Sequence, residues 1–187
     1  TSGFRMNAII FTAISGLLMM FLGAFFNDKK AIKYIASTLL IIDFAMSVIE
    51  LITKVTLFNI DKKAMLLGTD PFSLTFISLM LFCTVLYFLL SGSAIEKAGS
   101  QVAEYFALIF FILCGVAISA TYKSLLMLFL GVEIISIPLY ILTASDKRNL
   151  KSNEAALKYF LMGSFSTGIM LLGIAFLYGG STNATFH

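Results

Sequence analysis

EYFALIFFILCGVAISATYKSLLMLFLGVEIISIPLYILTA, residues 104–144, is one continuous run of mostly apolar residues. A straight helix of roughly 40 residues would be about 60 Å long, roughly twice the hydrocarbon thickness of a bilayer. The run must therefore fold back on itself and cross a membrane twice. We expect the turn at 119–123, where hydroxyl groups and Lys123 can reach the polar interface.

The composition of the whole chain agrees with a membrane environment. Of 187 residues, 59% are hydrophobic and only 12% are charged, and the mean hydropathy is +0.98. In soluble domains, about a quarter of the residues are charged. The apolar segments also lack the regular alternation of apolar and polar residues, over segments of about ten residues, that a transmembrane barrel requires. The sequence therefore predicts a helical membrane protein.

Apolar runs long enough for a helix of about 20 residues define the expected membrane spans. They predict an all-α fold, a polytopic transmembrane bundle of about six helices that forms a single membrane domain over residues 1–187. The expected spans are 4–26, 34–57, 72–91, 104–120, 122–144 and 154–178.

Lysine and arginine are more frequent in the loops on one side of these spans than on the other. Basic residues favour the cytoplasmic side of a membrane. This modest bias places residues 27–33, 92–103 and 145–153 in the cytoplasm. Both ends of the chain are then expected on the outer face.

Residues that usually carry catalysis or bind metals are scarce. Cys83 and Cys114 lie in apolar spans without a paired spacing, and the single histidine is the final residue. We therefore expect no metal site, no catalytic residue of a soluble-type enzyme and no nucleic-acid surface in this chain. What remains is charge inside the membrane, where ionisable groups are costly and usually functional.

Glu133 lies at the midpoint of the span 122–144, too far from either end for its side chain to reach the interface. Pro138 follows five positions later and cannot donate a hydrogen bond to the carbonyl of Ile134. Together these groups would form a polar, slightly bent spot that can hold water or a cation. The alternative is a protonated glutamate that makes one hydrogen bond between helices.

Lys158 lies about one turn inside the last span, four residues after Glu154. This spacing and order favour an ion pair along the helix. A cluster of small residues at 163–168 allows close contact with another helix, which could bring Lys158 toward the Glu133 path. The alternative is a lysine whose side chain simply extends to the interface.

Asp43 and Glu50 are seven residues apart in the second span, so they share a helix face with Ser47. This face either packs against a partner subunit or belongs to an ion route. Lys123, in the predicted turn, and Pro138 are further secondary polar positions.

Two segments separated by a short basic loop carry a family resemblance. LGVEIISIPLYIL at 130–142 and EAALKYFLMGSFSTG at 154–168 resemble subunit N of bacterial respiratory complex I, an NADH-quinone oxidoreductase. DPFSL at 70–74 is similar to that family as well, though less specific. The resemblance is good from about 70 to 178, whereas the first two spans match only in general character.

This resemblance implies an antiporter-like, proton-translocating subunit of about fourteen helices in the bacterial inner membrane. Such a subunit belongs to an electron-transport translocase but has no redox centre of its own. NADH, FMN, iron-sulfur clusters and quinone would bind other subunits, and the partners would be the other membrane-arm subunits, the lipid bilayer and protons. Since the principal buried lysine is expected on a later helix, we expect this chain to be a fragment.

The resemblance also implies a proton relay in which Glu133 works with buried lysines, and Lys158 matches another charged position of the family. A low dielectric favours the neutral form of a carboxyl group, whereas a nearby ammonium favours the charged form. Quinone reduction in another subunit would change the balance between the neutral and charged forms of Glu133. Two other functions remain open: a subunit of a multi-subunit cation/proton antiporter, and a structural membrane module whose charges only specify helix pairing.

Overall fold

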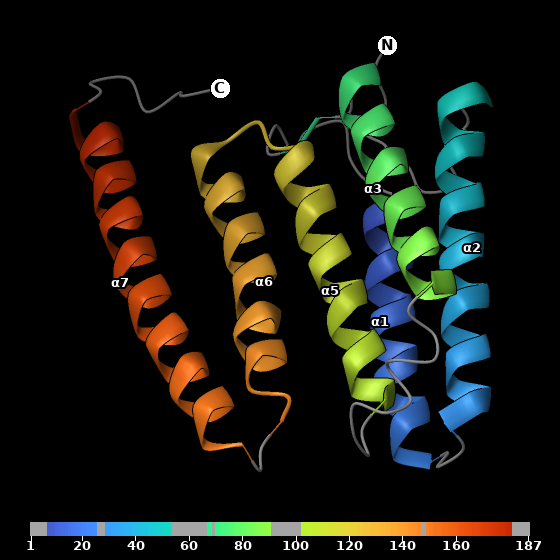
Figure 1. Ribbon diagram of the computed structural model, residues 1–187. Coiled ribbons are helices and arrows are strands. Elements are labelled where there is room, and N and C mark those ends of the chain that lie inside the picture. Colours follow the sequence, from blue (N-terminus) through green and yellow to red (C-terminus); the bar gives the residue numbers. More distant parts are fainter. Residues whose placement is uncertain are drawn as a thin grey trace.

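The computed structural model describes residues 7–25, 29–53, 67–68, 70–90, 102–146 and 149–180. Within these ranges it contains six helices, each long and apolar enough to cross a membrane (Figure 1). They are α1 (Asn7–Phe25), α2 (Lys29–Thr53), α3 (Pro71–Leu90), α5 (Val102–Ala120), α6 (Leu125–Thr143) and α7 (Leu150–Gly180). The prediction of an all-α transmembrane bundle is confirmed.

The long apolar run folds back where the sequence predicts a turn. α5 ends at Ala120 and α6 begins at Leu125. The N–H of Thr121 donates to the carbonyl of Ile118 at 3.2 Å, which tightens the end of α5. The two halves of the run therefore lie side by side as antiparallel helices, joined by a short polar turn.

Two helices begin before the apolar runs that indicate them. α2 begins at Lys29, inside a lysine-rich segment, and α7 begins at Leu150, ahead of the expected span 154–178. With 31 residues, α7 is about 46 Å long and exceeds the hydrocarbon core. Its polar first turns thus extend the helix beyond the apolar segment.

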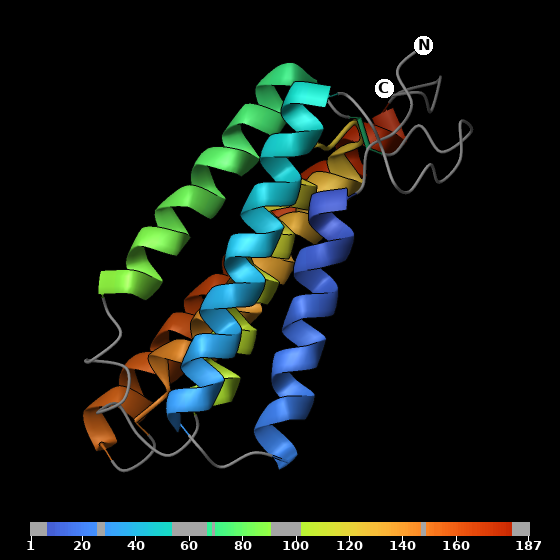
Figure 2. The same cartoon turned by 90° about the vertical axis from the view of Figure 1, so that its right-hand side faces the viewer.

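The helices alternate in direction and form two regions. α1, α2, α3 and α5 pack as a bundle, while α6 lies against α5 and α7 lies outermost against α6 (Figure 1). Figure 2 shows α2 between α3 and α1 in the bundle. Which end of the bundle faces the cytoplasm stays a prediction from the basic loops.

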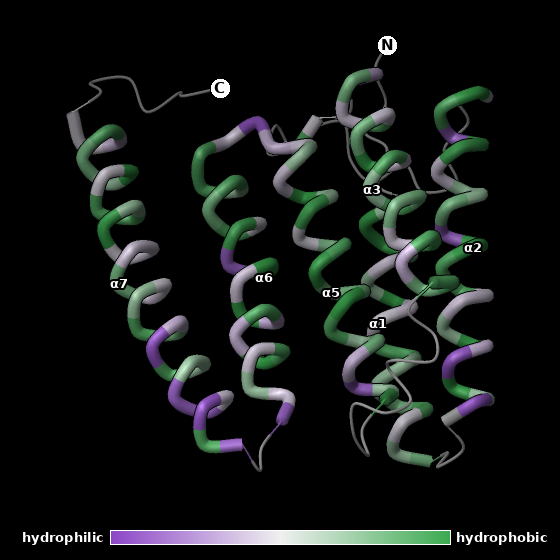
Figure 3. The backbone as a smooth tube through the Cα atoms, in the orientation of Figure 1, coloured by the Kyte–Doolittle hydropathy of each residue, from purple (hydrophilic) through white to green (hydrophobic). Residues whose placement is uncertain are grey.

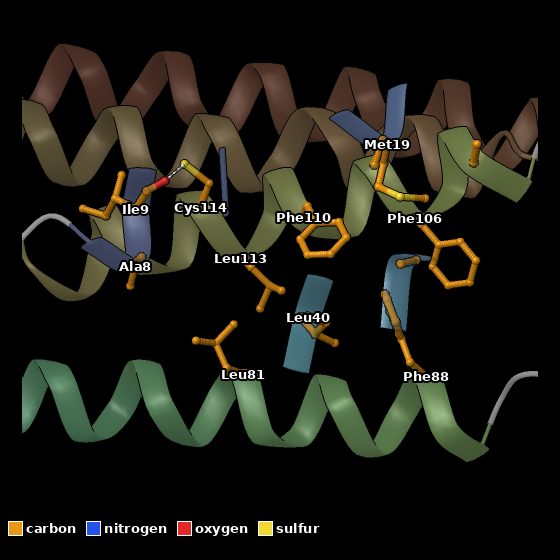
Figure 4. Close-up of a cluster of buried hydrophobic side chains, with 14 of the residues drawn as sticks. Ala8, Ile9, Met19, Leu40, Leu81, Phe88, Phe106, Phe110, Leu113 and Cys114 are labelled. Carbon is orange, nitrogen blue, oxygen red and sulfur yellow. Dashed lines mark hydrogen bonds between the residues drawn. The ribbon is translucent and has the colours of Figure 1, made fainter. Parts of the chain in front are cut away.

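The apolar core lies where α5 meets the first three helices. Phe106 and Phe110 of α5 are almost completely buried, and Phe88 of α3 packs edge-on against Phe106 with ring centroids 4.7 Å apart (Figure 4). On the α1 side, the thiol of Cys114 donates to the carbonyl of Ile9 at 3.8 Å. α5 is therefore the central helix of the chain.

Glycines allow α5 and α6 to approach closely. A Cβ on Gly115 would lie 2.8 Å from Cγ1 of Ile135 and 3.0 Å from the carbonyl oxygen of Gly131. A Cβ on Gly131 would collide with the hydroxyl of Ser119 and lie 2.9 Å from its backbone nitrogen. Small residues at such crossings let helix backbones touch, as is common in membrane bundles.

The segment before α3 is fastened to the α5–α6 turn. The N–H of Gly68 donates to the carbonyl of Thr121 at 2.6 Å, and Leu67 forms an isolated antiparallel bridge with Tyr122. Lys123 is exposed in the same turn, and its side chain runs over Gly68 in the space a Cβ would need. Lys123 is thus a residue of the helix connection rather than of either span.

Candidate functional site

Glu133 lies at mid-depth of the membrane-spanning part of the molecule. It is the only charged residue of α6 and lies about 12 to 15 Å from each end of that helix. Its side chain is half-buried, and Oε1 is buried without a hydrogen-bond partner among the described residues. Figure 3 shows polar positions within the otherwise hydrophobic α6.

The contacts of Tyr140 show which neighbouring helix lies on the side of α6 that carries Glu133. Tyr140 packs edge-on against Tyr159 and Phe160 of α7, with ring centroids 4.9 and 5.6 Å apart. Its hydroxyl occupies the space that a Cβ on Gly163 would need. Because residues seven positions apart share a helix face, the carboxyl of Glu133 is on the side of α6 that faces α7.

Two hydrogen bonds fix the level at which α7 passes Glu133. Ser152 Oγ donates to the carbonyl of Thr143 at 2.7 Å near one end, and the hydroxyls of Ser124 and Tyr178 lie 3.1 Å apart near the other. Counting residues along both helices from each of these hydrogen bonds places Glu133 beside residues 162–169 of α7. This stretch contains the small and hydroxylic cluster Gly163, Ser164, Ser166, Thr167 and Gly168.

Pro138 lies inside α6 and is buried. It has no N–H, so the carbonyl of Ile134, next to Glu133, lacks its usual partner one turn ahead. On the preceding turn, the hydroxyl of Ser136 donates to the carbonyl of Val132 at 2.8 Å. The helix therefore presents backbone and side-chain oxygens close to the carboxyl of Glu133.

Lys158 forms the ion pair along α7 that its spacing predicts. Its Nζ lies 2.5 Å from Oε1 of Glu154, and the two side chains are 69% and 64% exposed. Lys158 is adjacent to Tyr159, which contacts Tyr140, so its level differs from that of Glu133 by about seven residues, roughly 10 Å. The structure therefore does not bring Lys158 into contact with Glu133.

This separation limits the electrostatic interaction between Lys158 and Glu133. At roughly 10 Å and an effective dielectric of about 20, two unit charges interact by less than about 2 kcal/mol. Lys158 in this position therefore interacts only weakly with Glu133.

The second charged stripe lies inside the bundle. Asp43, Ser47 and Glu50 of α2 are each at most 2% exposed. Ser15 of α1 donates to Oδ1 of Asp43 at 3.3 Å, and the hydroxyls of Ser47 and Ser78 of α3 lie 2.8 Å apart. Helices of the same chain therefore cover this stripe, rather than the partner subunit that one reading of the sequence suggested.

The hydroxyl groups that meet these charges are not evident from the sequence. Ser15 and Ser78 come from helices whose register against α2 is not visible in a single sequence. One signal was present: Thr12, Ser15 and Gly16 form a small and polar strip on an otherwise apolar segment. Within the described ranges, no group of three or more His, Cys, Asp or Glu side chains could hold a metal ion.

Comparisons with known proteins show what this chain is similar to. A family model described as NADH:quinone oxidoreductase/Mrp antiporter, TM, matches residues 123–187, which include both α6 and α7. The NADH-quinone oxidoreductase subunit N of Flavobacterium psychrophilum is 38% identical over 176 residues, covering 94% of this chain and 37% of that protein. Over almost its whole length the chain is therefore similar to subunit N. Subunit N of Cytophaga hutchinsonii is also 38% identical, covering 97% of the chain.

The chain spans well under half the length of these subunit N relatives, 37% and 38% respectively. A solved structure of respiratory complex I from Thermus thermophilus with bound aureothin contains a chain of the same fold, with a TM-score of 0.74. That likeness covers 95% of this chain and 38% of the other at 24% identity. The family resemblance predicted from residues 130–142 and 154–168 is thereby confirmed.

Proposed function

We propose that this chain forms one part of a proton path in a membrane subunit of NADH-quinone oxidoreductase, with Glu133 as its mid-membrane station. The observation that carries the proposal is the half-buried carboxyl of Glu133 at mid-depth of α6, with one oxygen lacking a hydrogen-bond partner among the described residues. Such a group is costly in a membrane unless it exchanges a proton or serves a polar path. The subunit N relatives supply the enzyme context.

The surroundings of Glu133 suit reversible proton transfer. Pro138 leaves a backbone oxygen available beside the carboxyl, and the half-buried Thr167 of α7 is at nearly the same level. Hydroxyl groups can both donate and accept hydrogen bonds, so they can pass a proton on without becoming charged. Glu133 would then take a proton from one side and release it toward the other.

Lys158 and Glu154 supply a second, weaker element of the proposed relay. Their ion pair holds the ammonium about 10 Å from the level of Glu133. Movement of Lys158 away from Glu154 would change the charge felt by Glu133 without a direct contact.

The similarity to subunit N also supports a location and partners for the chain. We infer that the chain acts in the bacterial inner membrane beside other membrane-arm subunits, with both of its ends on the outer face. NADH, FMN, iron-sulfur clusters and quinone bind other subunits, and quinone reduction there supplies the energy. In this scheme the chain contributes to a translocase without carrying a redox centre.

The decisive test replaces Glu133 with glutamine in the full-length subunit within the assembled complex. We expect NADH oxidation and assembly to persist, while the number of protons moved per NADH oxidised falls severalfold in inside-out membrane vesicles. Glutamine keeps the size and hydrogen bonding of the side chain but cannot carry a proton. Glu104→Gln, at an exposed position in the first turn of α5, is the matched control. Full pumping in Glu133→Gln would rule out the relay role.

A second candidate function is a subunit of a cation/proton antiporter, since the matching family model also covers the Mrp antiporter. That function predicts sodium-driven proton movement in vesicles without any NADH. The same vesicles distinguish the two functions, because acidification that depends on NADH and not on sodium supports the oxidoreductase.

A further inference from the structure

Asp43 is a second isolated carboxyl group deep in the membrane, in a part of the chain that the proposed relay does not use. It lies ten residues before the end of α2 and fourteen after its start, about 15 and 20 Å from the two ends. The short side chain of aspartate cannot cover such a distance. Only 2% of the residue is exposed, so neither lipid headgroups nor bulk water solvate it.

The two oxygens of Asp43 have different surroundings. Oδ1 accepts a hydrogen bond from the hydroxyl of Ser15 of α1 at 3.3 Å. Oδ2 is buried and has no hydrogen-bond partner among the described residues. An ionised carboxylate accepts several hydrogen bonds, and a buried one that receives a single donor is strongly disfavoured. The arrangement fits a carboxylic acid whose carbonyl oxygen is Oδ1 and whose proton is on Oδ2.

No cation lies close enough to balance a negative charge at Asp43 in the described part of the bundle. α1 has no titratable side chain over Asn7–Phe25. Those of α3 are Cys83 and Tyr87, and those of α5 are Glu104, Tyr105 and Cys114. On α2 itself, the lysines are confined to positions 29, 30 and 33, at least ten residues or about 15 Å away, and Tyr34 and Glu50 bring no positive charge.

We propose that Asp43 is a proton-binding site within the α1–α2–α3 bundle, separate from the Glu133 path. A bound metal cation fits less well, because the hydroxyls one turn along the stripe, Ser47 and Ser78, are bonded to each other at 2.8 Å. Asp43 and Ser15 alone do not supply the number of oxygen ligands that hard cations require.

The site is extended along one face of α2. Ser47 is one turn from Asp43, and Glu50, which is 1% exposed, lies seven residues from Asp43 on the same side. Asp43, Ser47, Ser78 and Glu50 thus line a polar seam about 10 Å long inside an apolar bundle. α5 stands between this seam and α6, so protons bound here are not on the Glu133 path (Figure 1).

Infrared difference spectroscopy on exchange from H2O to D2O tests the proposal, because the C=O stretch of a protonated carboxyl is separate from carboxylate bands and shifts on deuteration. We use the full-length subunit in its complex, reconstituted in lipid at neutral pH. We expect one exchangeable band that is absent in Asp43→Asn and present in Glu133→Gln and Glu104→Gln. The result is therefore independent of whether Glu133 pumps protons.

Ser15→Ala supplies a second measurement that keeps the carboxyl in place, so that a failure of Asp43→Asn to assemble does not decide the matter. Loss of the donor to Oδ1 should move the band to higher frequency without removing it. A spectrum in which neither variant alters a protonated-carboxyl band would overturn the proposal. A band that disappears when sodium chloride replaces choline chloride would also overturn it, in favour of an alkali-cation site.

Discussion

The bundle of α1, α2, α3 and α5 differs from the pair α6 and α7 in how its polar groups are enclosed. Half of the residues in the membrane-spanning window of α5 are buried, whereas none are in that of α7. Asp43 is accordingly surrounded by its own chain, while Lys158 and Glu154 are open to whatever packs outside α7. The first region encloses its charge by internal packing, whereas the second leaves its charges exposed.

This difference follows from the side chains that each region offers. The bundle brings together large aromatic and aliphatic residues around α5, including Phe88, Phe106 and Phe110. α7 instead displays large apolar residues outward along its length, among them Met162, Phe165 and Phe176. This face of α7 is therefore available to lipid or to other helices.

The largest expected effect comes from removing the ring at the centre of the bundle. Phe110→Ala should lower the free energy of unfolding by about 3 kcal/mol, the lower part of the range for buried aromatics, since lipid adds little hydrophobic driving force. The measurement is thermal unfolding of the full-length subunit in mild detergent. Phe165→Ala, on the exposed face of α7, is the control and should change stability much less. Equal losses of unfolding free energy in the two variants would show that the bundle is not more tightly packed than the exposed face of α7.

A smaller effect is expected where the two regions meet. Gly131→Ala inserts a methyl group against Ser119 at the contact between α5 and α6, and overpacking of this kind costs about 1 to 3 kcal/mol. Gly173→Ala is the matched control, because no atom of the described chain lies within 4 Å of the added Cβ. The same unfolding measurement compares them. If Gly131→Ala proved as stable as Gly173→Ala, the close helix contact would not hold α6 in place.

Hydropathy predicted more of the fold than of the contacts. It reports whether a segment prefers lipid or water, so it indicated the helices, the turn at 119–123 and the depth of Glu133. It could not indicate that Ser15 meets Asp43 or that Ser78 meets Ser47, because those contacts depend on the rotation and order of helices. In a membrane these depend on small-residue packing that many helix pairs can offer equally.

In the candidate site too, the sequence predicted contacts within one helix but not contacts between helices. The spacing of Glu154 and Lys158 predicted their ion pair, since it is local to one helix. The distance from Lys158 to Glu133 depends instead on how α7 slides along α6. That register is fixed by the contacts of Ser152 and Tyr178 at the two ends, which a sequence pattern does not reveal.

The smallest expected effect tests the open side of the molecule. Glu154→Gln removes the partner of Lys158, but both side chains are more than 60% exposed, so the cost to stability should be at most about 0.5 kcal/mol. Its effect on proton transport should be moderate as well, because the ammonium remains about 10 Å from the level of Glu133. Pumping by Glu154→Gln at varied ionic strength measures this, with Glu104→Gln as control. A loss as severe as that of Glu133→Gln would mean that covering helices bury the Glu154–Lys158 pair, since only a desolvated ion pair interacts strongly enough to control Glu133 from that distance.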